Sequence, residues 1–194
     1  MASKIDIISN ALKLLGAQGT DTIGEDATDI VKAIRDFYDP EYRSILGSRY
    51  WSFALKGAVL SKLAGQLKVT GWEYTYAIPE DYLLISHMQP KSRYEIIGNV
   101  IYTNTNNTDS NNLPTLFYTH TVSEEVLPPH FSSYLERHFA AIFAMPVTQD
   151  VNVATLWANQ AKLMRNDSVV ADSQSQTSKR FENNYAEAAF YGAG

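Results

Sequence analysis

The spacing of the apolar residues changes twice along this chain of 194 residues, and that change limits the folds it can adopt. Apolar side chains recur three and four positions apart within residues 4–15 and 26–46, as they do in helices that bury one face. From about residue 50 to 121 the pattern becomes short runs of aromatic and β-branched residues, which favour strands. Helical spacing returns in residues 129–145 and 150–170. The sequence therefore predicts an α+β protein whose strand-rich insert separates the second helix from the third.

The apolar positions of three helices define the faces that we expect to be buried. On the second helix they are Ala27, Ile30, Val31, Ile34, Phe37 and Tyr38. On the third helix they are Phe131, Tyr134, Leu135, His138, Phe139, Ile142 and Phe143. On the fourth helix they are Val153, Trp157, Ala161, Met164 and Ser168.

Local signals mark where the helices begin and end. Ser3 and Asp6 fit a capping box at the start of the first helix, and Asp150 fits a cap at the start of the fourth. Pro40 should kink the second helix or restart it, because proline removes a helical hydrogen bond. Pro146 is expected to end the third helix.

The insert contains five segments that we expect to form strands. They are Val59–Leu63, Tyr74–Ile78, Leu83–Met88, Tyr94–Thr103 and Thr115–Thr121. Within the fourth segment, Gly98-Asn99 predicts a tight hairpin turn, because these residues tolerate the positive φ angles that such a turn needs.

Residues 1–170 are expected to form one domain, followed by a C-terminal arm over residues 171–194. Two residues apart, Trp51 and Phe53 would point to the same side of a strand and pack the sheet against the first two helices. The candidate core residues are Trp51, Phe53, Phe139 and Trp157.

The chain carries a formal net charge of −5 and has no cysteine. Proteins that wrap nucleic acid draw their affinity from clustered Lys and Arg, so this charge argues against such a role. Without cysteine, no disulfide, thiolate metal site or thiol nucleophile can form. Asp6 falls where a signal peptide needs apolar residues, and no stretch approaches the roughly 18 apolar residues of a membrane span. We expect a soluble chain that is not exported and has no membrane partner.

The residue types that carry catalysis are not grouped in the sequence. His130 and His138 lie eight positions apart, whereas a helical metal pair needs a spacing of four. Neither a Gly-x-Ser-x-Gly motif nor a glycine-rich phosphate loop occurs. Several acidic residues lie at expected helix starts and turns, where they are best interpreted as caps. They are Glu25, Asp26, Asp29, Glu80, Asp81, Glu124 and Glu125. The sequence therefore indicates no catalytic residue, no cofactor and no metal site.

Several segments resemble, in their order and spacing, the head-to-tail adaptor family of tailed bacteriophages, and most of all its tail tubular protein A members from short-tailed phages. The resemblance covers about residues 5 to 170. The segments are Ala11-Leu12-Lys13-Leu14-Leu15-Gly16, Gly24-Glu25-Asp26-Ala27-Thr28, Tyr38-Asp39-Pro40-Glu41-Tyr42-Arg43, Trp51-Ser52-Phe53-Ala54 and Tyr76-Ala77-Ile78-Pro79-Glu80-Asp81-Tyr82-Leu83, together with the Pro128-Pro129 helix and a last helix that begins near Asp150.

The resemblance implies a four-helix bundle with a small antiparallel β-sheet inserted between helices 2 and 3. It also implies a homo-oligomeric ring of twelve copies between the portal protein and a tail nozzle similar to tail tubular protein B. Such a structural, non-enzymatic ring extends the channel through which double-stranded DNA is retained and ejected, without sequence-specific binding. Its place is the head-tail junction of the virion, after assembly in the host cytoplasm.

In that family the C-terminal segment reaches the portal protein. The candidate portal-docking residues here are Phe181, Tyr185, Phe190 and Tyr191. The residues alone leave two alternatives open, because these aromatics could also pack back on their own subunit. The family often has an acidic end to the fourth helix, whereas this chain has Ser-Gln-Ser-Gln-Thr.

Two other functions stand beside the adaptor. A stopper or tail-completion protein would plug the channel and would differ from an adaptor in copy number and axial position. A cell-wall hydrolase carried in the tail would need two carboxylates at working distance in a cleft, a pattern that the sequence does not display.

Overall fold

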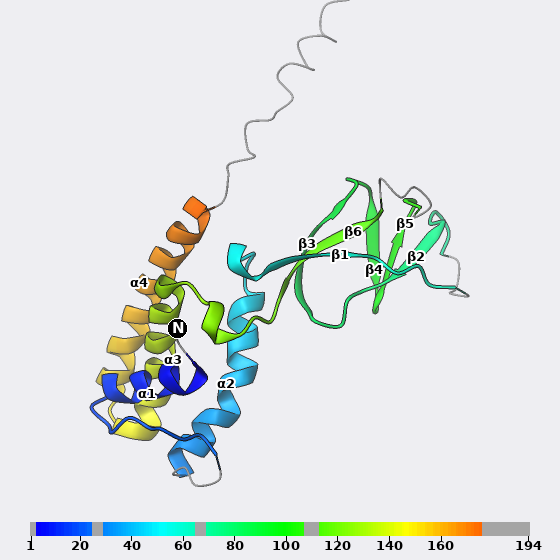
Figure 1. Cartoon of the computed structure of the whole chain (residues 1–194). Helices are drawn as coiled ribbons and strands as arrows, with labels where there is room; N and C mark the ends of the chain where they lie inside the picture. Colours follow the sequence, from blue (N-terminus) through cyan, green and yellow to red (C-terminus); the bar gives the residue numbers. More distant parts are fainter. Residues whose placement is uncertain (1–2, 25–28, 65–68, 107–112, 176–194) are drawn as a thin grey trace, which may run out of the picture.

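The computed structural model describes residues 3–24, 29–64, 69–106 and 113–175 (Figure 1). Its α-helices are α1 (Lys4–Leu14), α2 (Asp29–Gly47), α3 (Pro129–Thr148) and α4 (Val151–Ser175). Its strands are β1 (Leu55–Val59), β2 (Tyr74–Ala77), β3 (Tyr82–Gln89), β4 (Tyr94–Ile97), β5 (Val100–Thr103) and β6 (Thr115–His120), and two 3-10 helices are η1 (Ser52–Ala54) and η2 (Glu124–Val126). The predicted α+β class is confirmed.

The described strands form two antiparallel sheets of three strands, with the orders β1-β6-β3 and β2-β5-β4. The sequence predicts one small sheet, so the second sheet is an addition. The β4-β5 hairpin is confirmed, because Ile97 pairs with Val100 and Gly98 turns the chain with a φ of +61°. The first strand lies four residues earlier than predicted, since residues Leu55 to Val59 pair with β6, and Leu60 after it is buried in a core between the sheets.

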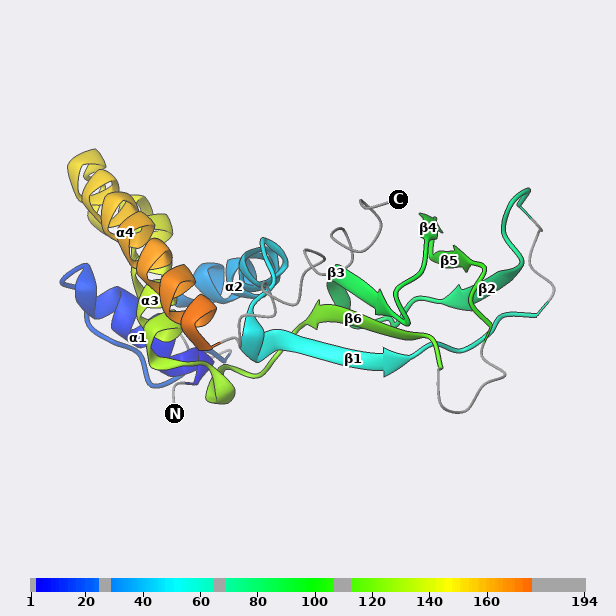
Figure 2. The same cartoon turned by 90° about the horizontal axis from the view of Figure 1, so that it is seen from above.

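The helices lie together and the strands project from them as a separate β region (Figures 1 and 2). In both views α3 lies between α4 and α2, and the β region extends on the side of α2. The β region has its own small core, which includes Tyr76, Ile101 and Tyr118. The helices and the chain segments next to them share a second and larger core.

The helix ends follow the predicted signals with two exceptions. Ser3 and Asp6 form the predicted capping box, and the Asp150 side chain accepts from the backbone N–H of Asn152 at 2.7 Å. Pro40 lies inside α2, which continues as one helix to Gly47. The prediction that Pro146 ends α3 is wrong, since the helix continues to Thr148. Because Pro146 lies close to the end of α3, its missing N–H removes only one hydrogen bond of the last turn.

The second exception is the end of α4. The sequence places it near residue 170, but the helix continues to Ser175 and so includes the first five residues of the expected arm. Residues 176–194, with the candidate portal-docking aromatics Phe181, Tyr185, Phe190 and Tyr191, lie outside the described residues.

Aromatic rings make up much of the helical core. Tyr38 of α2 stacks on Phe139 of α3, with ring centroids 4.5 Å apart. The ring of Trp51 lies edge to face with Phe131 at 4.7 Å, and its indole N–H donates to the carbonyl of Ile45 at 3.2 Å. Such aromatic pairs each contribute about 0.5–1.5 kcal/mol beyond the burial of their area. These contacts fix the middle of α2, and the turn that follows its C-terminal end, relative to α3.

The four predicted core residues all reach this core. Trp51 and Phe139 are fully buried, whereas Phe53 and Trp157 are half-buried. The strand predicted for Trp51 and Phe53 is wrong, because the segment forms η1. Both rings instead pack against Phe131 of α3, at 4.7 and 4.8 Å, so they join the turn to the helices.

A buried carboxylate fastens the end of α4 to η1. The Asp172 side chain is 1% exposed, and its Oδ1 accepts from the Ser52 backbone N–H at 2.9 Å and from the Ser52 hydroxyl. Arg49 Nη2 lies 3.9 Å from the other oxygen, Oδ2. Because Asp172 satisfies a backbone N–H that has left α2 and not yet entered β1, it holds α4 against the start of the β region.

Replacement of Asp172 by alanine should therefore destabilise the fold. The Ser52 amide would lose its charged acceptor, so we expect Asp172→Ala to lower the free energy of unfolding by about 1.5–3 kcal/mol. The exposed Asp167 on the same helix provides the control, and Asp167→Ala should change that energy by less than about 0.5 kcal/mol. Urea unfolding followed by circular dichroism gives both values. Equal stability of the two variants would contradict the role of Asp172.

Candidate interaction surface

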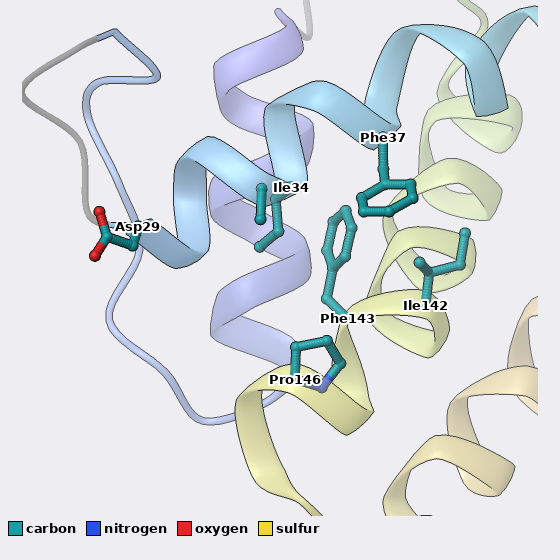
Figure 3. A pocket seen from close by; sticks show the side chains of 7 residues that line it. Asp29, Ile34, Phe37, Ile142, Phe143 and Pro146 are labelled. Atoms are coloured by element: carbon teal, nitrogen blue, oxygen red, sulfur yellow. The ribbon is translucent and has the colours of Figure 1, made fainter.

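An apolar groove lies between α2 and α3, with a volume of about 420 Å³ (Figure 3). Its lining residues are Asp29, Ala33, Ile34, Phe37, Ile142, Phe143 and Pro146. Figure 3 shows Phe37, Ile142 and Phe143 grouped between the two helices, while Asp29 lies apart at the far end. Asp29 is the one ionisable residue in this lining. The groove thus offers apolar surface to a partner and little that could perform chemistry.

The groove exists because the apolar face of α2 is wider than the core that it covers. Val31, Ile34 and Tyr38 are buried as predicted, but Phe37 is 66% exposed. Phe37 lies at the edge of that face and extends over the groove, where Ile142 of α3 is also exposed. A large aromatic side chain left in water next to an apolar hollow is typical of a protein-protein contact.

A second apolar surface lies on α4, and we call it the α4 ridge. It consists of Leu156, Leu163 and Val170, which are 54%, 58% and 56% exposed. These residues are seven positions apart, so they form one row along the helix, about 21 Å long. The opposite face of α4, which includes Ala161 and Ser168, is buried against the rest of the helical region. The row therefore faces away from the core.

A more polar hollow of about 500 Å³ lies between α3 and α4 and shares Ile142 with the groove. Its basic lining residues are His138, Lys162 and Arg165. His138 Nε2 lies 2.7 Å from Glu41 Oε1 of α2. Burial raises the pKa of the Tyr134 phenol in this hollow, and the positive charge of Arg165 offsets part of the rise. Lys162 and Arg165 have no ion-pair partner within the described ranges, which leaves positive charge beside the α4 ridge.

The histidines and carboxylates that could have formed a reactive site are separated. Among residues 3–24, 29–64, 69–106 and 113–175, no three metal-ligating side chains come together. His87 of β3 stacks on Phe117, with ring centroids 4.7 Å apart, whereas His138 lies in α3 and contacts Glu41 of α2. The capping role predicted for Asp81 is wrong, because its carboxylate accepts from Lys56 at 2.6 Å and from Tyr118 at 2.8 Å.

The Lys56 hydrogen bond, with a smaller contribution from Tyr118, lowers the pKa of the Asp81 carboxyl. This cluster lies at the β1-β6-β3 sheet, where the Lys56 and Asp81 side chains are 46% and 42% exposed and Tyr118 is buried. It links neighbouring strands across the sheet, and such exposed ion pairs contribute little to stability.

Comparison with known proteins provides no further assignment. No protein-family model matches this chain, and no curated protein matches it either. In the part of the chain that the structure covers, no helix is both long and apolar enough to cross a membrane. The groove and the α4 ridge therefore have to be interpreted from their own geometry.

If Phe37 belongs to an interaction surface, its replacement should change binding more than stability. We expect Phe37→Ser to alter the free energy of unfolding by less than about 0.5 kcal/mol, because most of the ring is already in water. The variant should bind less anilinonaphthalene sulfonate, measured by fluorescence. Val126→Ser, at a residue of η2 that is 61% exposed, is the matched control. The interpretation fails if both variants bind as much dye as the unchanged chain.

Proposed function

We propose that the chain is a structural subunit of a phage virion, a head-to-tail adaptor that forms a ring between the portal protein and the tail nozzle. The observation that carries the proposal is the pair of unlike apolar surfaces, the groove and the α4 ridge, on the α2 side and the α4 side of the helical region. A subunit that contacts two neighbours side to side needs two such surfaces. The order of sequence segments that resembles the adaptor family supplies the identity of the assembly.

The proposal includes a finer architecture. The four helices would act as the adaptor bundle, and the strands between α2 and α3 would act as the insert that projects from the ring. The contacts of Trp51 and Phe53 with Phe131 of α3 support this, because they attach the start of the β region to the helices. A ring of twelve copies is the number that the family resemblance implies.

The net charge of −5 supports a channel role. If acidic side chains line the lumen of the ring, they repel the phosphates of double-stranded DNA weakly, and the duplex can slide without adhering. The chain would then contact DNA without reading its sequence. The proposal assigns it no cofactor, no catalysis and no membrane partner, and places it at the head-tail junction of the virion after assembly in the host cytoplasm.

Electron microscopy of the purified protein mixed with portal protein tests this function. We expect closed rings of about twelve copies on one end of the portal, with an open axial channel. A plugged channel with fewer copies would indicate a stopper instead. A globular monomer that releases sugars from peptidoglycan would indicate a hydrolase and would refute the adaptor.

The same experiment tests the C-terminal residues. A chain that lacks residues 181–194 should keep its circular dichroism spectrum but lose most of its portal binding, because Phe181, Tyr185, Phe190 and Tyr191 are proposed to dock there. A variant with only the last two residues removed, which keeps the four aromatics, is the control. Portal binding of the long truncation at the level of the full chain would exclude this role.

A further inference from the structure

We infer that the α4 ridge of one copy binds in the α2-α3 groove of a second copy of this chain. The two surfaces are both apolar, and a helix with a row of aliphatic side chains is a shape that fits between two helices. Leu156, Leu163 and Val170 would enter beside Phe37 and Ile142. The contact names the side-to-side partner within the proposed ring, and in that sense it rests on the proposed function.

The composition of the ridge favours a groove over a second ridge. A two-stranded coiled coil buries two apolar positions in every seven residues. The α4 ridge supplies only one, because the next positions along the same face are Asn159, Asn166 and Ser173, all exposed. Symmetric pairing of two α4 helices would bury these polar side chains against each other. In the groove a single row is enough, and the polar residues stay at the rim.

The charges next to the two surfaces are complementary. Asp29 lies at one end of the groove, and Lys162 lies on α4 directly before Leu163. Neither has an ion-pair partner within the part of the chain that the structure describes. Binding of the ridge in the groove brings the ammonium of one copy toward the carboxylate of the other, which favours this contact over the pairing of two like surfaces.

The positions of the two surfaces determine what such a contact builds. In Figures 1 and 2 α4 and α2 lie on opposite sides of α3. A copy that receives a ridge in its groove therefore still presents its own ridge on the other side. This head-to-tail contact continues from copy to copy and closes into a ring when the rotation between copies permits it.

Disulfide crosslinking of single-cysteine variants tests the contact, since the natural chain has no cysteine to interfere. Phe37→Cys and Leu163→Cys change exposed side chains, so both variants should fold. One carries an affinity tag, and the two are mixed at high protein concentration under a mild oxidant. We expect at least a fivefold larger yield of mixed disulfide dimer than from Leu163→Cys mixed with Val126→Cys, a residue away from both surfaces. The double variant Phe37→Cys/Leu163→Cys should give a ladder of covalent oligomers.

Two results would overturn the inference. One is a mixed yield no larger than that of the Val126→Cys control, and the other is Leu163→Cys homodimer in excess over the mixed product, which means that α4 pairs with itself. The outcome is separable from the adaptor proposal. Rings on the portal without the crosslink reject the contact alone, whereas the crosslink without any portal binding rejects the adaptor and leaves the contact in place.

Discussion

The packing of Trp51 against Phe131 is the contact on which the arrangement of the whole molecule depends. Trp51 follows α2 and precedes β1, and Phe131 lies in the first turn of α3. One pair of rings therefore joins the end of α2, the start of the β region and the return of the chain into the helices. The guanidinium of Arg49 lies 4.8 Å from the Trp51 ring centroid, and the same arginine approaches Asp172 of α4. Three places that are distant in sequence, the turn between α2 and β1, the start of α3 and the end of α4, are thus held together.

This contact also explains the groove. With its C-terminal end held at Trp51 and its middle held by the stack of Tyr38 on Phe139, α2 cannot move closer to the last turns of α3. Phe37 and Ile142 then remain beside a space that the chain itself does not fill. An aromatic side chain in water brings no packing energy to the free subunit, so the groove is a surface whose stabilisation comes from a partner.

The sequence predicts the elements better than their contacts. The capping box of Ser3 and Asp6, the Gly98-Asn99 hairpin and the existence of all four helices follow from local chemistry and apolar spacing, and the structure confirms them. The prediction for the end of α3 is wrong because the cost of a proline in a helix depends on its distance from the helix end. The strand prediction at η1 is wrong because two aromatic residues two positions apart fit a strand as well as a turn in which both rings contact one residue, here Phe131.

The candidate surface, like these contacts, depends on how the helices pack. Apolar spacing assigns Phe37 and Ile142 to buried faces, and only three-dimensional packing leaves them exposed. The α4 ridge did leave a signal, since Leu156, Leu163 and Val170 repeat every seven residues on the side opposite Trp157 and Ala161. A helix with apolar residues on two opposite faces has more apolar surface than one core needs. That excess predicts a second partner.

The central claim is that copies of the chain assemble by placing the α4 ridge of one in the groove of the next. Sedimentation of two single variants and of their mixture tests it most directly. Phe37→Asp blocks the groove and Leu163→Asp blocks the ridge, and the other surface of each variant is intact. The account predicts that each variant alone remains monomeric, that the mixture forms pairs and nothing larger, and that the unchanged chain forms larger species. A mixture that stays monomeric while the unchanged chain assembles, or a variant that assembles alone as the unchanged chain does, would contradict it.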